Sequence, residues 1–107
     1  MYAVTENEID LEGQIIQTYT RDVINANVLT VEAGTTGYKG GDSGHGGRTY
    51  IRIEDAASTD ITVNPIHNKG NGGVEIILGG DAELETIITG LKFIIKVLED
   101  QSNEVYD

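Results

Sequence analysis

The chain has 107 residues, a length that fits one domain, and it contains no cysteine, which excludes disulfide bridges and thiolate metal sites. Its formal net charge of −11 argues against duplex nucleic acid or an anionic membrane as a partner, because the field of the protein would repel both. No apolar run approaches the roughly 18 residues of a membrane span and the start lacks a secretion signal, so we expect a cytoplasmic protein with a single domain, residues 1–107.

The first third of the chain predicts β-structure. Residues 1–13 are acidic and end in Gly, which indicates an N-terminal arm or a short edge strand that docks on a neighbour. Residues 14–20 and 23–31 are rich in β-branched residues and Tyr, so both are expected to be strands. Arg21 and Asp22 between them form the predicted turn of a hairpin.

A glycine-rich segment, residues 34–47, follows the predicted hairpin. Seven of its fourteen residues are Gly, and ordering such a chain costs so much entropy that a ligand or partner contacts should hold it. The alternative is a flexible connector, but pure linkers consist of Gly and Ser, whereas this segment interleaves Thr, Tyr, Lys, Asp and His. Its amides can turn toward an anion without obstruction by side chains, so we predict a ligand loop.

The same segment contains Gly-Asp-Ser-Gly, the tetrapeptide around the nucleophilic serine of trypsin-like proteases. That chemistry needs a His base that precedes the serine, and both histidines, His45 and His67, follow Ser43. A Walker loop is excluded because no Gly-x-x-x-x-Gly-Lys followed by Ser or Thr is present, and a dinucleotide loop is excluded because this loop leads into a strand rather than a helix. Both histidines, with Asp42 and Asp60, lack the spacing of a metal site, and a His base acting on a phosphodiester is the remaining catalytic alternative. We expect a protein that is not an enzyme, with no catalytic residue, no metal and no cofactor.

Residues 48–54 alternate between the two faces of a predicted strand. The face that we expect in the core consists of Thr49, Ile51 and Ile53. The other face consists of Arg48, Tyr50, Arg52 and Glu54. Its guanidinium groups suit phosphate and its ring suits stacking on a base. The alternative is an ordinary solvated face whose arginines pair with acids across the strands.

Two further strands and a helix complete a predicted α+β fold, a small antiparallel sheet followed by a C-terminal amphipathic helix that packs on it. The strands are residues 58–66 and 73–79, joined by a loop at 67–72. The helix is residues 81–99, and residues 100–107 are predicted to be a polar tail. The apolar stripe of the helix is predicted to consist of Leu84, Ile87, Ile88, Leu91, Ile94, Ile95 and Leu98.

Phe93 and Val97 lie beside Gly90 and widen the apolar surface of this helix. Either one broad face lies on the sheet, or this side meets a second partner such as the same helix of another subunit. The core is lean, because only 38% of the residues are hydrophobic and 14 are Gly. A lean core favours a homo-oligomer that buries surface between subunits.

The predicted ligand site combines loop amides with cationic and aromatic side chains. Lys39, Arg48 and Arg52 are opposed only by Asp42 between positions 33 and 53, a local balance of three minus one, or +2. Such a site fits a small phosphate-bearing molecule, with His, Asp and Asn side chains for ribose or base edges. The predicted ligand-binding residues are Gly37, Tyr38, Lys39, Gly40, Gly41, Asp42, Ser43, His45, Gly46, Arg48, Tyr50, Arg52 and Asn68.

The run G-T-T-G-Y-K-G-G-D-S-G-H-G-G-R-T-Y-I-R-I, residues 34–53, resembles the phage-encoded Thoeris anti-defence sponge proteins. The resemblance implies non-catalytic sequestration of a cyclic nucleotide, a cyclic ADP-ribose isomer, in pockets shared between subunits of a dimer or dimer-built hexamer inside an infected bacterial host. For some members of the family, the resemblance also implies that cyclic oligonucleotides are held at separate sites. The family has two C-terminal helices, whereas this chain has one continuous pattern in which Gly90 is a candidate break. Only the aromatic and Arg positions of the run are supported individually.

A second hypothesis belongs to another class of protein. Small, acidic proteins without cysteine also serve phages as DNA mimics that occupy the nucleic-acid groove of a defence nuclease. An acidic DNA-mimic inhibitor should display organised acids on one exposed face. It leaves the glycine loop without a role.

Overall fold

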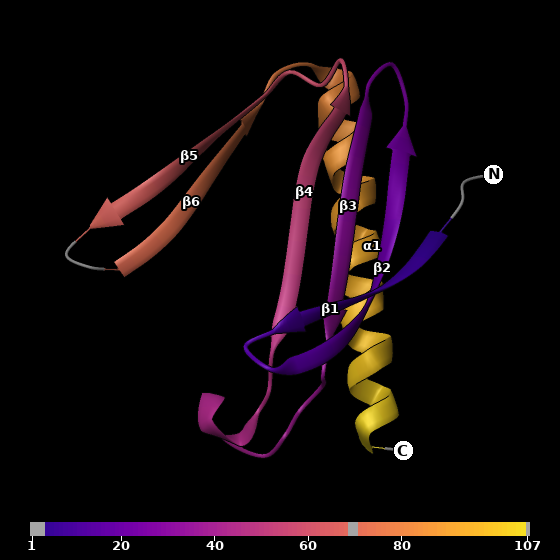
Figure 1. Cartoon of the computed structure of the whole chain (residues 1–107). Helices are drawn as coiled ribbons and strands as arrows, with labels where there is room; N and C mark the ends of the chain where they lie inside the picture. Colours follow the sequence, from indigo (N-terminus) through magenta and orange to yellow (C-terminus); the bar gives the residue numbers. More distant parts are fainter. Residues whose placement is uncertain (1–3, 69–70, 107) are drawn as a thin grey trace.

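The computed structural model describes residues 4–68 and 71–106, and there the chain forms two antiparallel sheets and one C-terminal helix (Figure 1). The elements are β1 (Val4–Leu11), β2 (Gln14–Ile24), β3 (Val28–Thr35), the 3-10 helix η1 (Ser43–His45), β4 (Thr49–Ala57), β5 (Ile61–Asn68), β6 (Asn71–Leu78) and α1 (Asp81–Tyr106). One sheet has the order β1-β2-β3-β4, and the other is the hairpin β5-β6. The predicted α+β fold, with the helix on the sheet, is confirmed.

The hairpin of β2 and β3 has its turn later than predicted. Arg21 and Asp22 are strand residues that pair with Val31 and Thr30, so the prediction of a turn at these positions is wrong. The Thr30 hydroxyl donates a hydrogen bond to the Asp22 carboxylate over 2.6 Å, which gives this turn-forming residue a partner within the sheet. The chain reverses at residues 25–27 instead.

β1 is an edge strand, one of the two alternatives predicted for the N-terminal segment. It pairs with β2 from Val4 opposite Arg21 to Leu11 opposite Gln14. The turn between them places Glu12 and Gly13 at positive φ angles. β1 and the start of β2 swing across the sheet on the side away from α1, which brings their turn toward the segment between β3 and β4 (Figure 1).

Small residues set the face by which α1 packs on the sheet. Thr86 and Gly90 are buried together with Ile94 and Val97, and a Cβ atom at position 90 would lie only 3.0 Å from the Val31 side chain. The sheet therefore receives the side of the helix that carries Gly90 and Val97. Four of the seven residues in the predicted stripe, namely Leu84, Ile88, Leu91 and Ile95, stay exposed. Phe93 and Val97 pack against the core on the sheet, so the alternative in which their side of the helix meets a second partner is wrong. The apolar face on the sheet leaves out the four exposed residues of the stripe.

The helix is also longer than predicted. It runs without a break through Gly90 to Tyr106, so most of the predicted polar tail is helical. No helix in the described ranges is long and apolar enough to cross a membrane. Because the C-terminal turns extend past the sheet, they reach the segment between β3 and β4 (Figure 1).

A buried polar trio joins three parts of the chain at the opposite end of α1. The Asn27 side-chain amide donates to the Thr59 hydroxyl, and the Thr86 hydroxyl donates to the Asn27 side-chain oxygen, both over 3.1 Å. Thr59 in turn donates to the backbone oxygen of Val28. Buried polar groups are tolerated when they are hydrogen-bonded, so the trio fixes the β2–β3 turn and the β4–β5 connection to the helix.

One helix covers only part of the strand surface. Ile53 packs against the core, but Ile51, also predicted to be in the core, is 53% exposed on β4. The β5-β6 hairpin projects from the body, and Val63, Val74 and Ile77 on it are exposed (Figure 1). Its strands extend into the predicted loop at 67–72, and the remaining residues of that loop, 69–70, lie outside the described residues.

Gly34 is required where β2 passes closest to the end of β3. A Cβ atom there would collide with the backbone oxygen of Gln17 and with Thr18, and a backbone atom cannot swing aside. We expect Gly34→Ala to lower the free energy of unfolding by about 2 kcal/mol or more, measured by urea titration. The matched control is Gly72→Ala, where a Cβ meets nothing within 4 Å. Equal effects at the two positions would contradict this account.

Candidate functional site: the glycine loop

The glycine loop, defined here as residues 36–48, is closed at its neck by threonines. The amide of Thr36 donates to the backbone oxygen of Arg48, and the amide of Arg48 donates to the hydroxyl of Thr36, each over 3.0 Å. The hydroxyls of Thr35 and Thr49 lie 2.9 Å apart across the two strands. The side chain of Gln101 on α1 accepts from the Thr35 amide over 2.9 Å and so braces the neck from the helix.

The distal part of the loop contains the short helix η1. The Asp42 carboxylate accepts from the amide of Gly44 and lies 3.2 Å from the His45 ring nitrogen, and Gly46 ends the turn at φ 91°. A Cβ atom at Gly41 would run into the His45 ring, so this glycine permits the ring to fold back. Asp42 and His45 therefore help to shape the loop, although both side chains stay exposed.

Arg48 holds three segments of the chain together. Its Nη1 atom donates to the backbone oxygens of Ser43 and Gly47 over 3.0 and 2.8 Å. Its Nε atom donates to the carboxylate of Glu12 in the β1–β2 turn. Hydrogen bonds from a charged donor are stronger than neutral ones, so Arg48 anchors η1 to the neck and to the turn.

Arg52 is paired with carboxylates of its own chain. Glu32, whose side chain is only 6% exposed, accepts from Arg52 Nε over 2.9 Å and also from the Thr18 hydroxyl. Glu54 binds the other side of the guanidinium. The hydrogen bond to Glu32 is the main cause that raises the pKa of Arg52. The cross-strand pairing that the sequence left as an alternative is the observed arrangement at this residue.

An open hollow of about 480 Å³ lies against the loop. The predicted site residues that line it are Gly37, Tyr38, Lys39, Gly40, Gly41, Asp42, Ser43 and Arg48, joined by Gly47 and Thr49, which the sequence did not single out. His45, Gly46, Tyr50 and Arg52 do not line this hollow. Asn68 ends β5 on the projecting hairpin, away from the loop of its own chain (Figure 1), and its side chain lies outside the described residues.

Two properties of this hollow are relevant to anions. The amides of residues 39–43 form no hydrogen bond within the described part of the chain. The Lys39 ammonium likewise forms no ion pair there. Tyr38, 64% exposed, stands between this hollow and a second one of about 440 Å³ along the last turns of α1. The loop thus presents amides, one cation and one ring to the same space.

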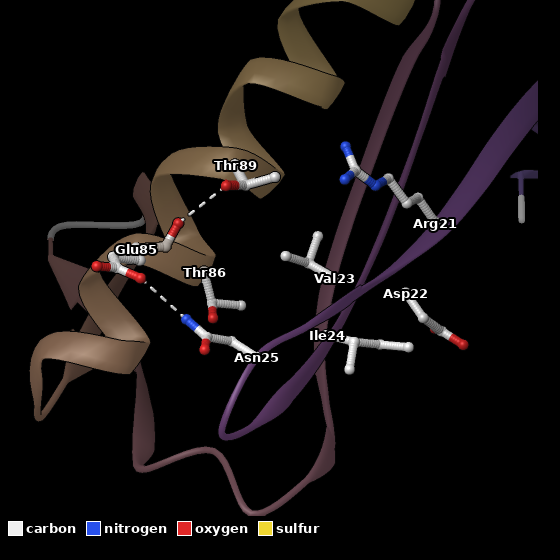
Figure 2. Close-up of a pocket in the computed structure, with 8 residues that line it drawn as sticks. All are labelled: Arg21, Asp22, Val23, Ile24, Asn25, Glu85, Thr86 and Thr89. Carbon is white, nitrogen blue, oxygen red and sulfur yellow. Dashed lines mark hydrogen bonds between the residues drawn. The ribbon is translucent and has the colours of Figure 1, made fainter. Parts of the chain in front are cut away.

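A separate hollow of about 470 Å³ lies between the end of β2 and the first half of α1 (Figure 2). Arg21 and Asp22 line its strand side, and Glu85 and Thr89 line its helix side. The Asn25 amide bridges the two sides by donating to Glu85 over 3.1 Å. Acidic groups outnumber basic ones on its walls, so it is a poorer place for a phosphate than the glycine loop.

Comparisons with known proteins do not suggest a function, so a proposed function has to be argued from the geometry of the glycine loop. No family model, curated protein sequence or solved structure matches this chain. Among the side chains that the structure describes, no group of three or more His, Cys, Asp or Glu could hold a metal ion. The glycine loop is the feature in which predicted site residues gather most densely.

Loss of the Arg48 anchor should loosen the loop without unfolding the sheet. We expect Arg48→Ala to speed hydrogen exchange of the His45 and Gly46 amides by about tenfold or more, because three charged hydrogen bonds are removed. Nuclear magnetic resonance of the exchanging amides measures this change. Lys39→Ala is the control, since its ammonium forms no ion pair in the described chain. Unchanged hydrogen exchange in Arg48→Ala would show that the loop stays ordered without the hydrogen bonds of Arg48.

Proposed function

We propose that the protein binds and sequesters, without chemical turnover, a small phosphate-bearing signalling nucleotide in the hollow of the glycine loop. The ligand class is a cyclic ADP-ribose isomer or a cyclic oligonucleotide. The role is that of a phage counter-defence sponge in the cytoplasm of an infected bacterial host. The observation that supports this proposal is that the amides of residues 39–43, which form no hydrogen bond within the described residues, lie around one hollow with the Lys39 ammonium and the exposed Tyr38 ring.

The amides of residues 39–43 are the proposed phosphate contacts. Successive backbone amides in turn conformations form concave anion sites, and glycines let a phosphate approach the backbone closely. Gly40, at φ 81°, has open space where a Cβ would stand. Ordered threonines at the neck and Arg48 at the base hold this segment before any ligand arrives, which lowers the entropy that binding must overcome.

Charged side chains are assigned by the ion pairs that they form within the described residues, and Tyr38 is assigned by its exposure. Lys39 is the proposed charge partner of a phosphate, and the exposed ring of Tyr38 is the proposed stacking surface for a base, worth about 1–3 kcal/mol. Arg48 contributes by holding the loop, because carbonyls and Glu12 already engage its guanidinium. Arg52 is left out of the proposed contacts, since Glu32 and Glu54 neutralise it.

The electrostatics of the hollow are modest once the ion pairs are counted. Glu12 offsets Arg48, and Asp42 offsets Lys39, so the nearby formal charge is close to zero. Attraction of a phosphate must then come from directed amide dipoles and from one ammonium rather than from an excess of cations. Such a site favours a compact ligand with one or two phosphates over a long polyanion.

Binding is tested by isothermal titration calorimetry with cyclic ADP-ribose isomers, cyclic dinucleotides and ADP-ribose. We expect one ligand class to bind tightly and to be recovered with unchanged mass. Tyr38→Ala and Lys39→Ala should each weaken binding by about tenfold or more, because they remove stacking and the ammonium contact. Lys96→Ala is the matched control, since Lys96 pairs with Asp100 on the helix. Recovery of a cleaved ligand would replace sequestration by catalysis.

The DNA-mimic hypothesis gains one specific observation. Glu6, Glu8 and Asp10 alternate along β1, so their exposed carboxylates share one face of an edge strand at a spacing of roughly 7 Å. Charged residues also protect edge strands from aggregation, which is a sufficient reason for their presence. We rank sequestration first because mimicry leaves the ordered loop unused.

The same titration separates the two functions. A mimic should show no heat with any nucleotide of the panel and should bind a defence nuclease. Combined replacement of Glu6→Gln, Glu8→Gln and Asp10→Asn should then abolish nuclease binding and leave nucleotide binding unchanged. Loss of nucleotide binding in this triple variant would contradict a site at the glycine loop.

A further inference from the structure

A row of large apolar side chains runs along the outer face of α1. Leu84, Ile88, Leu91 and Ile95 are each between 44% and 57% exposed, although the chain has few apolar residues to spare. They face away from the sheet, which receives the Gly90 and Val97 side. We call these four residues the outer seam. An exposed apolar row of this length marks an interaction surface.

The spacing of the outer seam identifies the kind of partner. Its residues are four, three and four positions apart, the alternation of core positions in paired helices. A flat sheet or a peptide strand does not require this alternation. The partner is therefore an α-helix lying nearly parallel or antiparallel to α1.

The outer seam is self-complementary about a two-fold axis midway between positions 88 and 91. An antiparallel copy places Leu84 opposite Ile95 and Ile88 opposite Leu91, so each layer joins one Leu to one Ile. This exchange of equivalent residues is what a symmetric dimer interface requires. A second copy of the chain fits the surface without any further assumption about its shape.

Charges beside the outer seam select the antiparallel direction. Glu85 and Lys92 lie on the same side of the outer seam. In the antiparallel pair, Glu85 of one helix and Lys92 of the partner helix lie between the same two layers, Leu84–Ile95 and Ile88–Leu91. In a parallel pair the same positions would face Gly80 and Ile87, which carry no charge. Lys92 forms no ion pair within the described residues of its own chain.

The carboxylate that Lys92 would meet is already oriented. Asn25 donates to one oxygen of Glu85 over 3.1 Å, which fixes this side chain on the wall of the hollow between β2 and α1 (Figure 2). The other carboxylate oxygen has no hydrogen bond in the described structure. An oriented acid loses less rotamer entropy on pairing than a free one.

We propose that two copies of this chain pair antiparallel through the outer seams of their α1 helices, with reciprocal Glu85–Lys92 ion pairs. The proposal concerns the helix and is independent of the ligand. The proposal implies that the molecular mass in solution corresponds to two chains, or to an even number of chains where dimers assemble further.

Cysteine cross-linking tests the pairing and its direction, because the chain has no cysteine of its own. We expect a mixture of Leu84→Cys and Ile95→Cys chains to form a disulfide-linked dimer under mild oxidation. Each variant alone should not form this disulfide. In the antiparallel pair, the two copies of the same position lie eleven residues apart along the helix, about 16 Å, which is too far for a disulfide. Cross-linking of Leu84→Cys with itself would overturn the antiparallel arrangement. A monomer by sedimentation equilibrium would overturn the dimer.

Charge exchange tests the ion pairs separately. Glu85→Lys and Lys92→Glu should each raise the dimer dissociation constant by about tenfold or more, and the double variant should restore it to within about threefold. Restoration excludes an effect that acts only through the lost Asn25 contact, because the double variant lacks that contact too. A double variant as weak as the single ones would overturn the Glu85–Lys92 assignment.

Discussion

The close approach of α1 to β3 at Gly90 determines the rest of the molecule. With no side chain at position 90 and a short one at Thr86, the helix axis can lie near Val31, and this fixes the rotation of the helix about that axis. The rotation directs Val97 inward. It also carries Gln101 to the neck of the glycine loop, where its side chain bonds Thr35. One packing contact thus sets the core, the brace on the loop and the face of the helix that stays exposed.

Local patterns in the sequence were sufficient for most of the fold, and they failed where a longer-range contact decided the outcome. Strand composition and helical spacing located β2 to β6 and α1, and β1 as one of two alternatives, but they did not predict η1. Arg21 and Asp22 have the character of turn residues, but Thr30 gives Asp22 a partner across the sheet, and the Arg21 guanidinium lies 5.9 Å from the centre of the Phe93 ring. The apolar stripe was assigned by hydrophobicity, whereas small size decided which face touches the sheet. Hydrophobicity alone cannot distinguish a face that packs on a sheet from one that awaits another chain.

A loop does join β3 to β4 within the glycine-rich segment, although Gly34 and Thr35 belong to β3. The state of its arginines could not be predicted. Glu12 and Glu32 lie 36 and 20 residues from the arginines that they bind, and only the fold brings them together. Glu32 occupies a central strand, where an ionised carboxylate is retained only if it is paired. Arg52 satisfies it, so this cation is committed to the sheet before any ligand is considered. The charges can be counted from the sequence, but only the structure shows which of them form ion pairs with each other.

The proposed ligand site and the proposed dimer share one geometric consequence. The glycine loop lies at the C-terminal end of α1, because Gln101 contacts its neck, and the β5-β6 hairpin joins the N-terminal end, where Glu83 contacts Asp60. An antiparallel helix pair places the C-terminal end of one helix beside the N-terminal end of the other. The loop of one chain and the projecting hairpin of its partner then lie at the same end of the dimer. A hollow that is open on one chain leaves much of a nucleotide in water, whereas tight binding sites bury most of the ligand surface. The second chain is where the missing wall of such a site would come from, and the exposed apolar residues of the hairpin are suited to supply it.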